Sequence, residues 1–202
     1  MKETGILFIV SGPSGTGKST LCRDLIKLIP TLNFSISYTT RLPRRDEKTG
    51  RDYNFVSRDT FNTMISKGDF AEWAEIYGHL YGTSRPFIEQ KLQEGSDLLL
   101  DIDFKGAQQL KKFFPHAVTV FVIPPSVEEL EKRLQKRETD SSIAIRERVA
   151  KACAEIAQAR NYAYIIINDI YVQALQSLHS IVLAETHRGE RMEKYLTIFS
   201  NF

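Results

Sequence analysis

Cysteine is nearly absent from this sequence, because the 202 residues contain only Cys22 and Cys153. Two isolated cysteines exclude a disulfide framework and a metal site built from cysteine, so reduced thiols are expected. The apolar stretch at residues 6–10 is far too short to span a bilayer, and no signal-peptide cleavage pattern follows it. Together these absences predict a cytoplasmic protein.

A large excess of charge of either sign is also missing. The formal net charge is +2, so composition gives no argument for a nucleic-acid partner or an anionic membrane, and neither is expected. An anion site must therefore come from local placement of Lys and Arg. The chain also lacks repeats, low-complexity tracts and flexible linkers. Its length suits one globular core carrying small insertions.

What the sequence does contain is four short, continuous apolar runs separated by segments with helical periodicity. A continuous run predicts a strand that is covered on both faces, as in a parallel sheet. Strands that alternate with helices predict an open α/β sheet with right-handed crossovers. The predicted strands are 7–10, 98–100, 118–123 and 165–167, and the predicted helices are 19–29, 105–114, 127–136 and 143–160.

Residues 34–83 do not follow this alternation. Three strand-like stretches, 53–56, 70–77 and 80–82, and a short helix near 59–67 indicate a mostly β insertion. The predicted organisation is a core of residues 1–33 and 84–202 that carries this insertion. A polar stretch at about 137–142 is expected to form a mobile lid, and a last helix is expected beyond Arg188.

A phosphate-binding motif, G-x-x-x-x-G-K-[ST], lies without mismatch between the first predicted strand and the first predicted helix. Its glycines allow several backbone N–H groups to face one anion, and the following helix adds the positive end of its dipole. Lys18 is expected to reach the β- and γ-phosphates, and the Ser19 hydroxyl to ligate Mg²⁺. The predicted ATP-binding loop is Gly12, Pro13, Ser14, Gly15, Thr16, Gly17, Lys18, Ser19 and Thr20.

The other predicted strands also end in residues suited to a ligand site. Asp101 follows three leucines, as a Walker-B acid follows its strand, and can hold Mg²⁺ directly or through water. An alternative role for Asp101 is to cap the next helix. Because ligands bind at the carboxyl ends of strands in open α/β sheets, Gly12, Asp101, Pro124 and Asn168 are expected to surround one crevice.

A cluster of arginines in the insertion suggests a site for a second phosphate. Arg41, Arg44 and Arg45 lie within five residues, and two guanidinium groups would neutralise a dianionic monophosphate. Tyr53 and Tyr81 can each add a phenolic hydrogen bond. The alternative interpretation of this segment is a solvated surface loop.

Glu72 is a charged residue inside an apolar strand-like segment, where it either faces solvent or recognises a polar group. Together with Asp103 it suggests selection of guanine. Guanine presents N1–H and N2–H₂ donors, whereas adenine presents an unprotonated N1 acceptor, so a carboxylate accepts from the first base and repels the second. Discrimination through buried polar groups is strong.

Taken together, these residues resemble the guanylate kinases of the bacterial and eukaryotic soluble type over about residues 5–187. The resemblance implies a P-loop kinase fold with an NMP-binding insertion and a short lid. It implies transfer of the γ-phosphoryl group of ATP to GMP in the presence of Mg²⁺, with dGMP as a further acceptor. The matching stretches are GPSGTGKST at 12–20, FSISYTTR at 34–41, GRDYNFV at 50–56, EWA at 72–74, YGT at 81–83, LDID at 100–103, PPS at 124–126 and IND at 167–169.

The resemblance also implies roles for single side chains. Those implied to bind guanine are Ser37, Glu72, Thr83 and Asp103, and those implied to bind the GMP phosphate are Arg41, Arg44, Tyr53 and Tyr81. Those implied to surround ATP and its lid are Arg133, Arg137, Arg148 and Asn168. Catalytic roles are expected for Lys18, Arg41, Arg137 and Arg148, and Mg²⁺ ligation for Ser19 and Asp101.

The sequence departs from the family pattern at Asp46 and Glu138, where the family usually has glycine. Both residues restrict positive φ angles and add negative charge near arginines, so the geometry of the two loops is in question while the reaction is not. One alternative function is a non-catalytic guanylate-kinase-like module that binds proteins, but intact Lys18 argues against it. Another is a related kinase acting on AMP, UMP, dTMP or a ribose bisphosphate. Whether the chain forms a homo-oligomer is left open.

Overall fold

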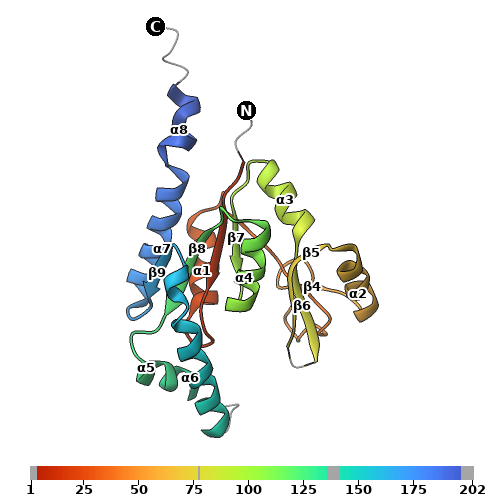
Figure 1. Cartoon of the computed structure of the whole chain (residues 1–202), viewed down its shortest axis with the longest axis vertical. Helices are drawn as coiled ribbons and strands as arrows, with labels where there is room; N and C mark the ends of the chain where they lie inside the picture. Colours follow the sequence, from red (N-terminus) through yellow and green to blue (C-terminus); the bar gives the residue numbers. More distant parts are fainter. Residues whose placement is uncertain (1–3, 77, 136–141, 197–202) are drawn as a thin grey trace.

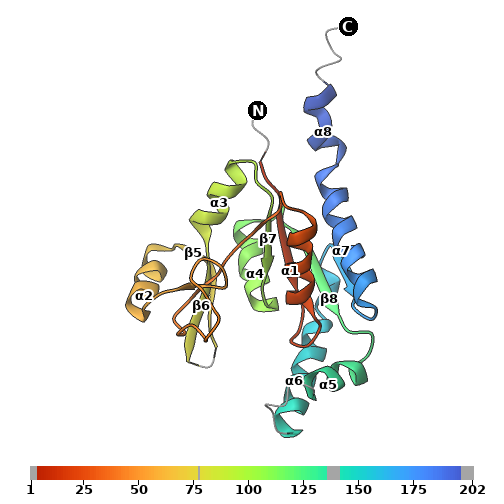
Figure 2. The ribbon, with the colours of Figure 1, turned by 180° about the vertical axis from the view of Figure 1, so that it is seen from behind.

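Two sheets, one larger and one smaller, organise the chain in its computed structural model, which describes residues 4–76, 78–135 and 142–196 (Figures 1 and 2). Within these ranges, no helix has the length and apolar character needed to cross a membrane. The strands are β1 (Leu7–Ser11), β2 (Asn33–Phe34), β3 (Tyr38–Thr39), β4 (Asn54–Phe55), β5 (Phe70–Ile76), β6 (His79–Ser84), β7 (Leu98–Asp101), β8 (Val118–Ile123) and β9 (Tyr164–Ile167). The helices are α1 (Lys18–Leu28), α2 (Arg58–Lys67), α3 (Arg85–Gln93), α4 (Phe104–Phe113), α5 (Val127–Gln135), α6 (Ser142–Ile156), the 3₁₀ turn η1 (Ala159–Asn161), α7 (Tyr171–Thr186) and α8 (Gly189–Leu196).

The larger sheet has the strand order β2-β7-β1-β8-β9, and all of its pairings are parallel. All four apolar runs that the sequence singled out are strands of this sheet, and helices cover both of its faces. The predicted α/β fold, with a parallel sheet flanked by helices, is therefore confirmed. The short edge strand β2 was not predicted.

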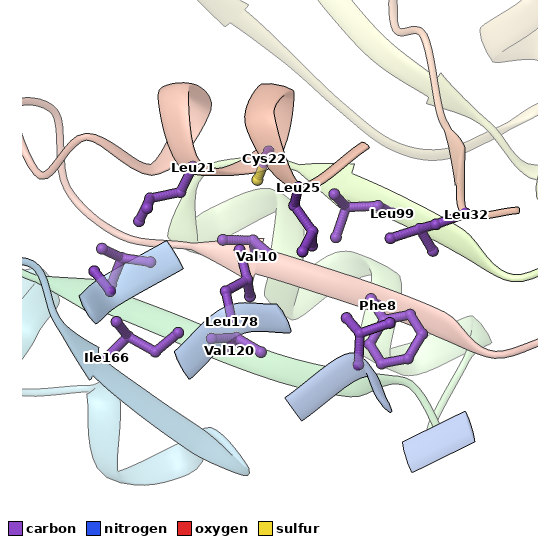
Figure 3. Close-up of a cluster of buried hydrophobic side chains, with 13 residues drawn as sticks. Phe8, Val10, Leu21, Cys22, Leu25, Leu32, Leu99, Val120, Ile166 and Leu178 are labelled. Carbon is purple, nitrogen blue, oxygen red and sulfur yellow. The ribbon is translucent and has the colours of Figure 1, made fainter. Parts of the chain in front are cut away.

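Alternate residues of β1 enter two different hydrophobic cores, which explains why the strand is apolar at every position. Phe8 and Val10 pack on the side of α1 and α7 (Figure 3), whereas Leu7 and Ile9 pack on the side of α3 and α4. Each of these four side chains is at most 3% exposed. Burying one such side chain stabilises the fold by about 1.5–3 kcal/mol.

The smaller sheet is built from the segment that departs from the α/β alternation. Its strand order is β4-β3-β6-β5, with β5 and β6 forming an antiparallel hairpin. Helix α2 covers this sheet, because Phe61 stacks on Phe70 of β5 at a centroid distance of 4.3 Å. The mostly β character predicted for this segment agrees with these strands, and β5 is described up to Ile76.

Several features differ from the sequence prediction. Helices α3 and α7 were not predicted, although α7 buries Ala174, Leu178 and Val182 at a spacing of four residues. The helix predicted for 143–160 ends at Ile156 and continues as the turn η1, and no Gly or Pro marks that end in the sequence. Most of the predicted lid, at 137–141, lies outside the described residues. The predicted last helix is α8.

Candidate active site

The loop between β1 and α1 curls around a cavity of about 260 Å³. Gly12 has a φ of 149°, and a Cβ there would lie 2.3 Å from the carbonyl oxygen of Val122 on β8. Gly17 caps α1 with a φ of 84° and provides no side-chain cap, so the first N–H groups of the helix are left to other acceptors. A glycine loop followed by a helix N-terminus is suited to bind phosphate.

Asn168, at the end of β9, braces this loop. Its side-chain amide donates a 2.7 Å hydrogen bond to the carbonyl of Thr16, and its own backbone N–H donates to the carbonyl of Ile123 over 2.8 Å. Arg133 of α5 donates in turn to the carbonyl of Asn168 over 3.0 Å and to Glu129 over 2.8 Å. The ends of β8 and β9 are therefore joined to the glycine loop that follows β1.

Lys18 lies at the start of α1, with its Nζ 3.3 Å from Oδ1 of Asp101 at the end of β7. This buried Oδ1 has the ion pair but no hydrogen bond of good geometry, so it keeps lone pairs for another partner. The cap of α4 is Asp103, whose Oδ1 accepts from the N–H of Gly106 over 2.8 Å. The alternative that Asp101 caps α4 is therefore wrong.

A second and larger cavity, of about 670 Å³, opens between α1 and the segments 34–37 and 47–53, which lead into the smaller sheet. Ser19 lines both cavities, so the two spaces meet at the start of α1. Of the residues predicted for the acceptor or the metal, Ser19, Ser37, Tyr53 and Asp101 line this cavity, whereas Asp103 lines the first one. Arg23 and Glu47 also line it, and neither was predicted as a site residue.

The residues predicted to bind guanine form one connected group. Glu72 is 9% exposed, and its Oε1 accepts a 2.5 Å hydrogen bond from Thr83, which lies 3.4 Å from the Ser37 hydroxyl. A Cβ on Gly106 would lie 3.1 Å from Glu72 Oε2 and 3.4 Å from Asp103 Oδ1, so both carboxylates border the start of α4. The alternative that Glu72 faces solvent is wrong.

The same burial changes the acidity of Glu72. Loss of water raises the pKa of this carboxyl group to about 7, and the negative charge of Asp103 adds to the rise. The hydrogen bond from Thr83 acts in the opposite direction, since it favours the charged form. Glu72 therefore changes its charge near neutral pH.

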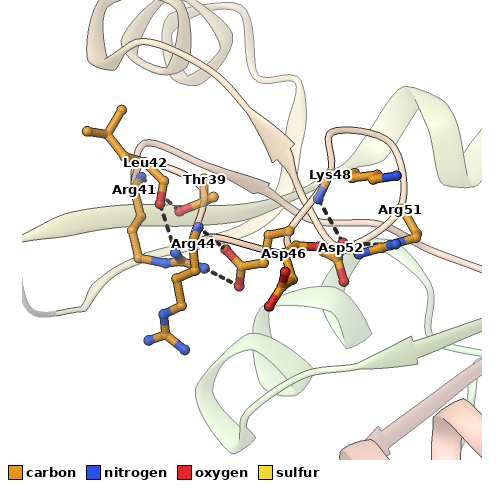
Figure 4. A network of polar contacts seen from close by, with 9 residues as sticks. Thr39, Arg41, Leu42, Arg44, Asp46, Lys48, Arg51 and Asp52 are labelled. Carbon is orange, nitrogen blue, oxygen red and sulfur yellow. Dashed lines mark hydrogen bonds and ion pairs between the residues drawn. The ribbon is translucent and has the colours of Figure 1, made fainter.

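Aromatic rings surround the arginine that was predicted to bind the acceptor phosphate. The Arg41 guanidinium lies 5.5 Å from the centre of the Tyr53 ring, and the Tyr53 and Tyr81 rings are 5.9 Å apart. Only 15% of the Arg41 side chain is exposed, which argues against a merely solvated loop. Arg44 is exposed and lies on the same loop (Figure 4).

Two residues of α6 that the sequence analysis missed line the first cavity, namely Lys151 and Glu155. Burial raises the pKa of Glu155. With the predicted Arg148, they follow the i, i+3, i+7 spacing of one helix face, a signal that was available in the sequence.

Arg137 and Glu138 lie outside the described residues. Asp46 is exposed, and its carbonyl accepts a 2.6 Å hydrogen bond from Arg51.

Comparison with known proteins identifies the family to which this geometry belongs. The family model described as Guanylate kinase matches residues 5–185. The chain belongs to the guanylate kinase family. It is 48% identical over 197 residues to a guanylate kinase of Geobacter metallireducens, covering 98% of this chain and 97% of that protein. With a guanylate kinase of Geobacter sulfurreducens it shares 48% identity over 192 residues, covering 95% of each chain.

A solved structure of the guanylate kinase family supports the same conclusion. The crystal structure of guanylate kinase from Anaplasma phagocytophilum matches with a TM-score of 0.75 and 31% identity, covering 97% of this chain and 95% of that one. The predicted function is confirmed: the protein is an ATP-dependent nucleoside monophosphate kinase that acts on GMP.

Proposed function

We propose that the two cavities hold the two substrates, with the ATP phosphates in the glycine loop and GMP between α1 and the segments that lead into the smaller sheet. The observation that carries this proposal is that Ser19 lines both cavities, so the donor and acceptor phosphates would meet at the N-terminus of α1. In this arrangement, residues 34–83 act as the GMP-binding unit of a core formed by residues 1–33 and 84–202.

In the proposed reaction, an oxygen of the GMP phosphate attacks the γ-phosphorus of ATP in line. The bond between that phosphorus and the β–γ bridging oxygen breaks, which gives GDP and ADP. The attacking phosphate is already deprotonated at neutral pH, so no general base is needed. Catalysis then consists of positioning and charge neutralisation. Lys18 would neutralise the transferring group, together with Arg137 and Arg148.

On the acceptor side, Arg41 and Arg44 would hold the GMP phosphate with the hydroxyl groups of Tyr53 and Tyr81. Glu72 and Asp103 would accept hydrogen bonds from guanine N1–H and N2–H₂, and Ser37 and Thr83 would complete the recognition of the base. Two contacts support this proposal, namely the hydrogen bond from Thr83 to Glu72 and the cation–π contact of Arg41 with the Tyr53 ring. A GMP analogue without the 2′-hydroxyl, dGMP, is a further proposed acceptor.

The residues at the junction of the cavities suit Mg²⁺, since this ion prefers oxygen ligands. Ser19 and Asp101 would hold it, and support comes from the buried Asp101 Oδ1, which lacks a well-oriented hydrogen bond. When bound with ATP, the ion would neutralise charge on the β- and γ-phosphates. We place the reaction in cytoplasmic purine nucleotide metabolism, where it returns GMP to the diphosphate pool.

A coupled assay of ADP release tests this proposal with GMP, dGMP, AMP, CMP and UMP as acceptors, in the presence and absence of Mg²⁺. GMP should give the highest kcat/KM, and removal of the metal should abolish turnover. Equal rates with GMP and AMP would refute the roles of the two carboxylates. No ADP release with any acceptor would favour the non-catalytic alternative.

A further inference from the structure

One carboxylate in the acceptor cavity has no role in the proposed mechanism. Glu47 Oε1 accepts a 2.9 Å hydrogen bond from Nη2 of Arg41, and its Oε2 accepts a 2.8 Å hydrogen bond from the backbone N–H of Arg44 (Figure 4). The Glu47 side chain is 20% exposed and lines the larger cavity. A single carboxylate thus joins the two arginines that are proposed to bind the acceptor phosphate.

We propose that Glu47 is a positioning residue for the GMP phosphate. It holds the guanidinium plane of Arg41 and the backbone of Arg44 in the arrangement that receives the phosphate. This inference rests on the proposed assignment of both arginines to that phosphate.

The donors of Arg41 explain how it can bind Glu47 and a phosphate together. A guanidinium group has five N–H donors. One is used by Glu47, and another donates to the carbonyl of Leu42 over 2.8 Å. The remaining donors are sufficient for a bidentate contact with phosphate. The Tyr53 and Phe55 rings, 5.5 Å and 5.9 Å from the guanidinium carbon, restrict its movement further.

A second carboxylate completes the support of this loop. Asp52 accepts hydrogen bonds from the backbone N–H of Lys48 over 2.9 Å and from Nε of Arg51 over 2.8 Å. Arg51 also donates to the carbonyl of Asp46 over 2.6 Å. The loop is therefore held at both ends by its own side chains. Such preorganisation strengthens binding because less conformational freedom is lost on association.

Positioning and simple electrostatics make opposite predictions for the loss of Glu47. Removal of a negative charge beside Arg41 and Arg44 makes the cavity more positive, which by itself would strengthen binding of a phosphate. A carboxylate that merely occupied the phosphate site would also compete with GMP, and its loss would again strengthen binding. Loss of a positioning contact weakens binding. The direction of the change therefore decides between these roles.

The test compares Glu47→Ala and Glu47→Gln with the unsubstituted protein. Loss of hydrogen bonds to a charged group predicts that Glu47→Ala raises the KM for GMP about tenfold, while the KM for ATP changes less than about twofold. Glu47→Gln keeps one acceptor oxygen, so its KM for GMP should lie between that of Glu47→Ala and that of the unsubstituted protein. Glu75→Gln is the matched control, since Glu75 of β5 pairs with Arg58 of α2 at 3.3 Å and lines neither substrate cavity.

Calorimetric binding of GMP and of guanosine separates positioning from general loss of structure. Guanosine has no phosphate, so Glu47→Ala should weaken GMP and leave guanosine unchanged. In an Arg41→Ala background, Glu47→Ala should have a smaller further effect, because only its contact with the backbone of Arg44 is then left to lose.

A fall or no change in the KM for GMP in Glu47→Ala would overturn the inference, as would equal weakening of GMP and guanosine. If Arg41→Ala itself leaves the KM for GMP unchanged, the proposed phosphate site fails. If Arg41→Ala weakens GMP while Glu47→Ala does not, only the role of Glu47 fails.

Discussion

The hydroxyl of Thr83 donates a 2.5 Å hydrogen bond to Oε1 of Glu72, a carboxylate that is only 9% exposed. A buried carboxylate strongly prefers its neutral form unless donors stabilise its charge. Thr83 provides one such donor, and the N–H groups of guanine would provide more. Near neutral pH, Glu72 is therefore present in both its neutral and its charged form, and the charged form is the one that accepts hydrogen bonds from guanine.

This balance makes recognition of the base depend on pH. The pKa of Glu72 is about 7, so the carboxylate that accepts from guanine is lost progressively as the pH falls below 7. Between pH 8 and pH 6 the dissociation constant for guanosine should rise about tenfold, as expected for one titrating group. Calorimetry with guanosine measures this directly, because the compound has no phosphate that titrates in the same range. Glu72→Gln should bind weakly at every pH, and a flat profile for the unsubstituted protein would contradict the role of Glu72.

The same group should make the stability depend on pH in a defined direction. The folded-state pKa is raised from 4.5 to about 7, so between these values the folded protein binds more protons than the unfolded chain. The contribution of Glu72 to the free energy of unfolding therefore decreases as the pH rises from 4.5 to 7. Urea denaturation measures the free energy of unfolding at several pH values, with Glu72→Gln as the reference. Between pH 4.5 and 7 this free energy should decrease less in the variant than in the unsubstituted protein.

Substitution of Thr83 by valine tests the donor while keeping the shape of the side chain. Without the hydroxyl, the charged form of Glu72 loses a stabilising partner, and its pKa should rise further. The KM for GMP at pH 7 should rise by about five- to tenfold, consistent with one hydrogen bond to a charged group. The KM for ATP should not change. A parallel rise in both constants would indicate a general disturbance of β6.

Substitution of Lys18 by alanine should impair catalysis while the fold is retained. The Lys18 side chain is 19% exposed and pairs with Asp101 over 3.3 Å, at the edge of the glycine loop. Loss of its charge at the transferring phosphoryl group should reduce kcat by about two to three orders of magnitude. Because the substitution leaves the mostly buried Asp101 carboxylate without its ion pair, the free energy of unfolding should also fall, by up to about 3 kcal/mol, while the fold is retained. Lys27→Ala on the same helix is the control, and a near-normal kcat in Lys18→Ala would remove this lysine from the mechanism.

Substitution of Asn168 should raise the KM for ATP and leave the KM for GMP unchanged. Its amide donates to the carbonyl of Thr16 over 2.7 Å, and this carbonyl belongs to the glycine loop. Asn168→Ala removes that donor, so the loop loses a brace and the KM for ATP should rise about fivefold, a typical effect of one hydrogen bond. Steady-state kinetics with each substrate varied in turn measures the effect. Asn161→Ala, in an exposed turn, is the control, and an effect confined to GMP would contradict this assignment.

The sequence predicted the main strands and the glycine loop because both depend on local pattern. The stretch 7–10 of β1 is buried on both faces and is therefore apolar throughout, and the glycine at position 12 is required by the close approach of Val122. Which aspartate of the segment Asp101-Ile102-Asp103 caps the next helix could not be told in this way. Only the structure shows that Asp101 pairs with Lys18 while Asp103 caps α4.

The role of Glu47 was equally hidden from the sequence. It is one charged residue among many in a polar loop, and its importance comes from which donors its two oxygens reach. Those donors are Arg41 and the backbone of Arg44, and the contacts depend on how the loop folds back on itself. Side-chain type can be read from a sequence, but the choice of partner in a loop cannot.

The two carboxylates proposed to select the base come from different parts of the fold. Glu72 belongs to β5 of the smaller sheet, and Asp103 caps the start of α4, which follows β7 of the larger one. A base that contacts both would act as a tether between the sheets. A nucleotide with a different base would therefore have two disadvantages. It would bind weakly, and its phosphate would not be aligned with the γ-phosphate of ATP.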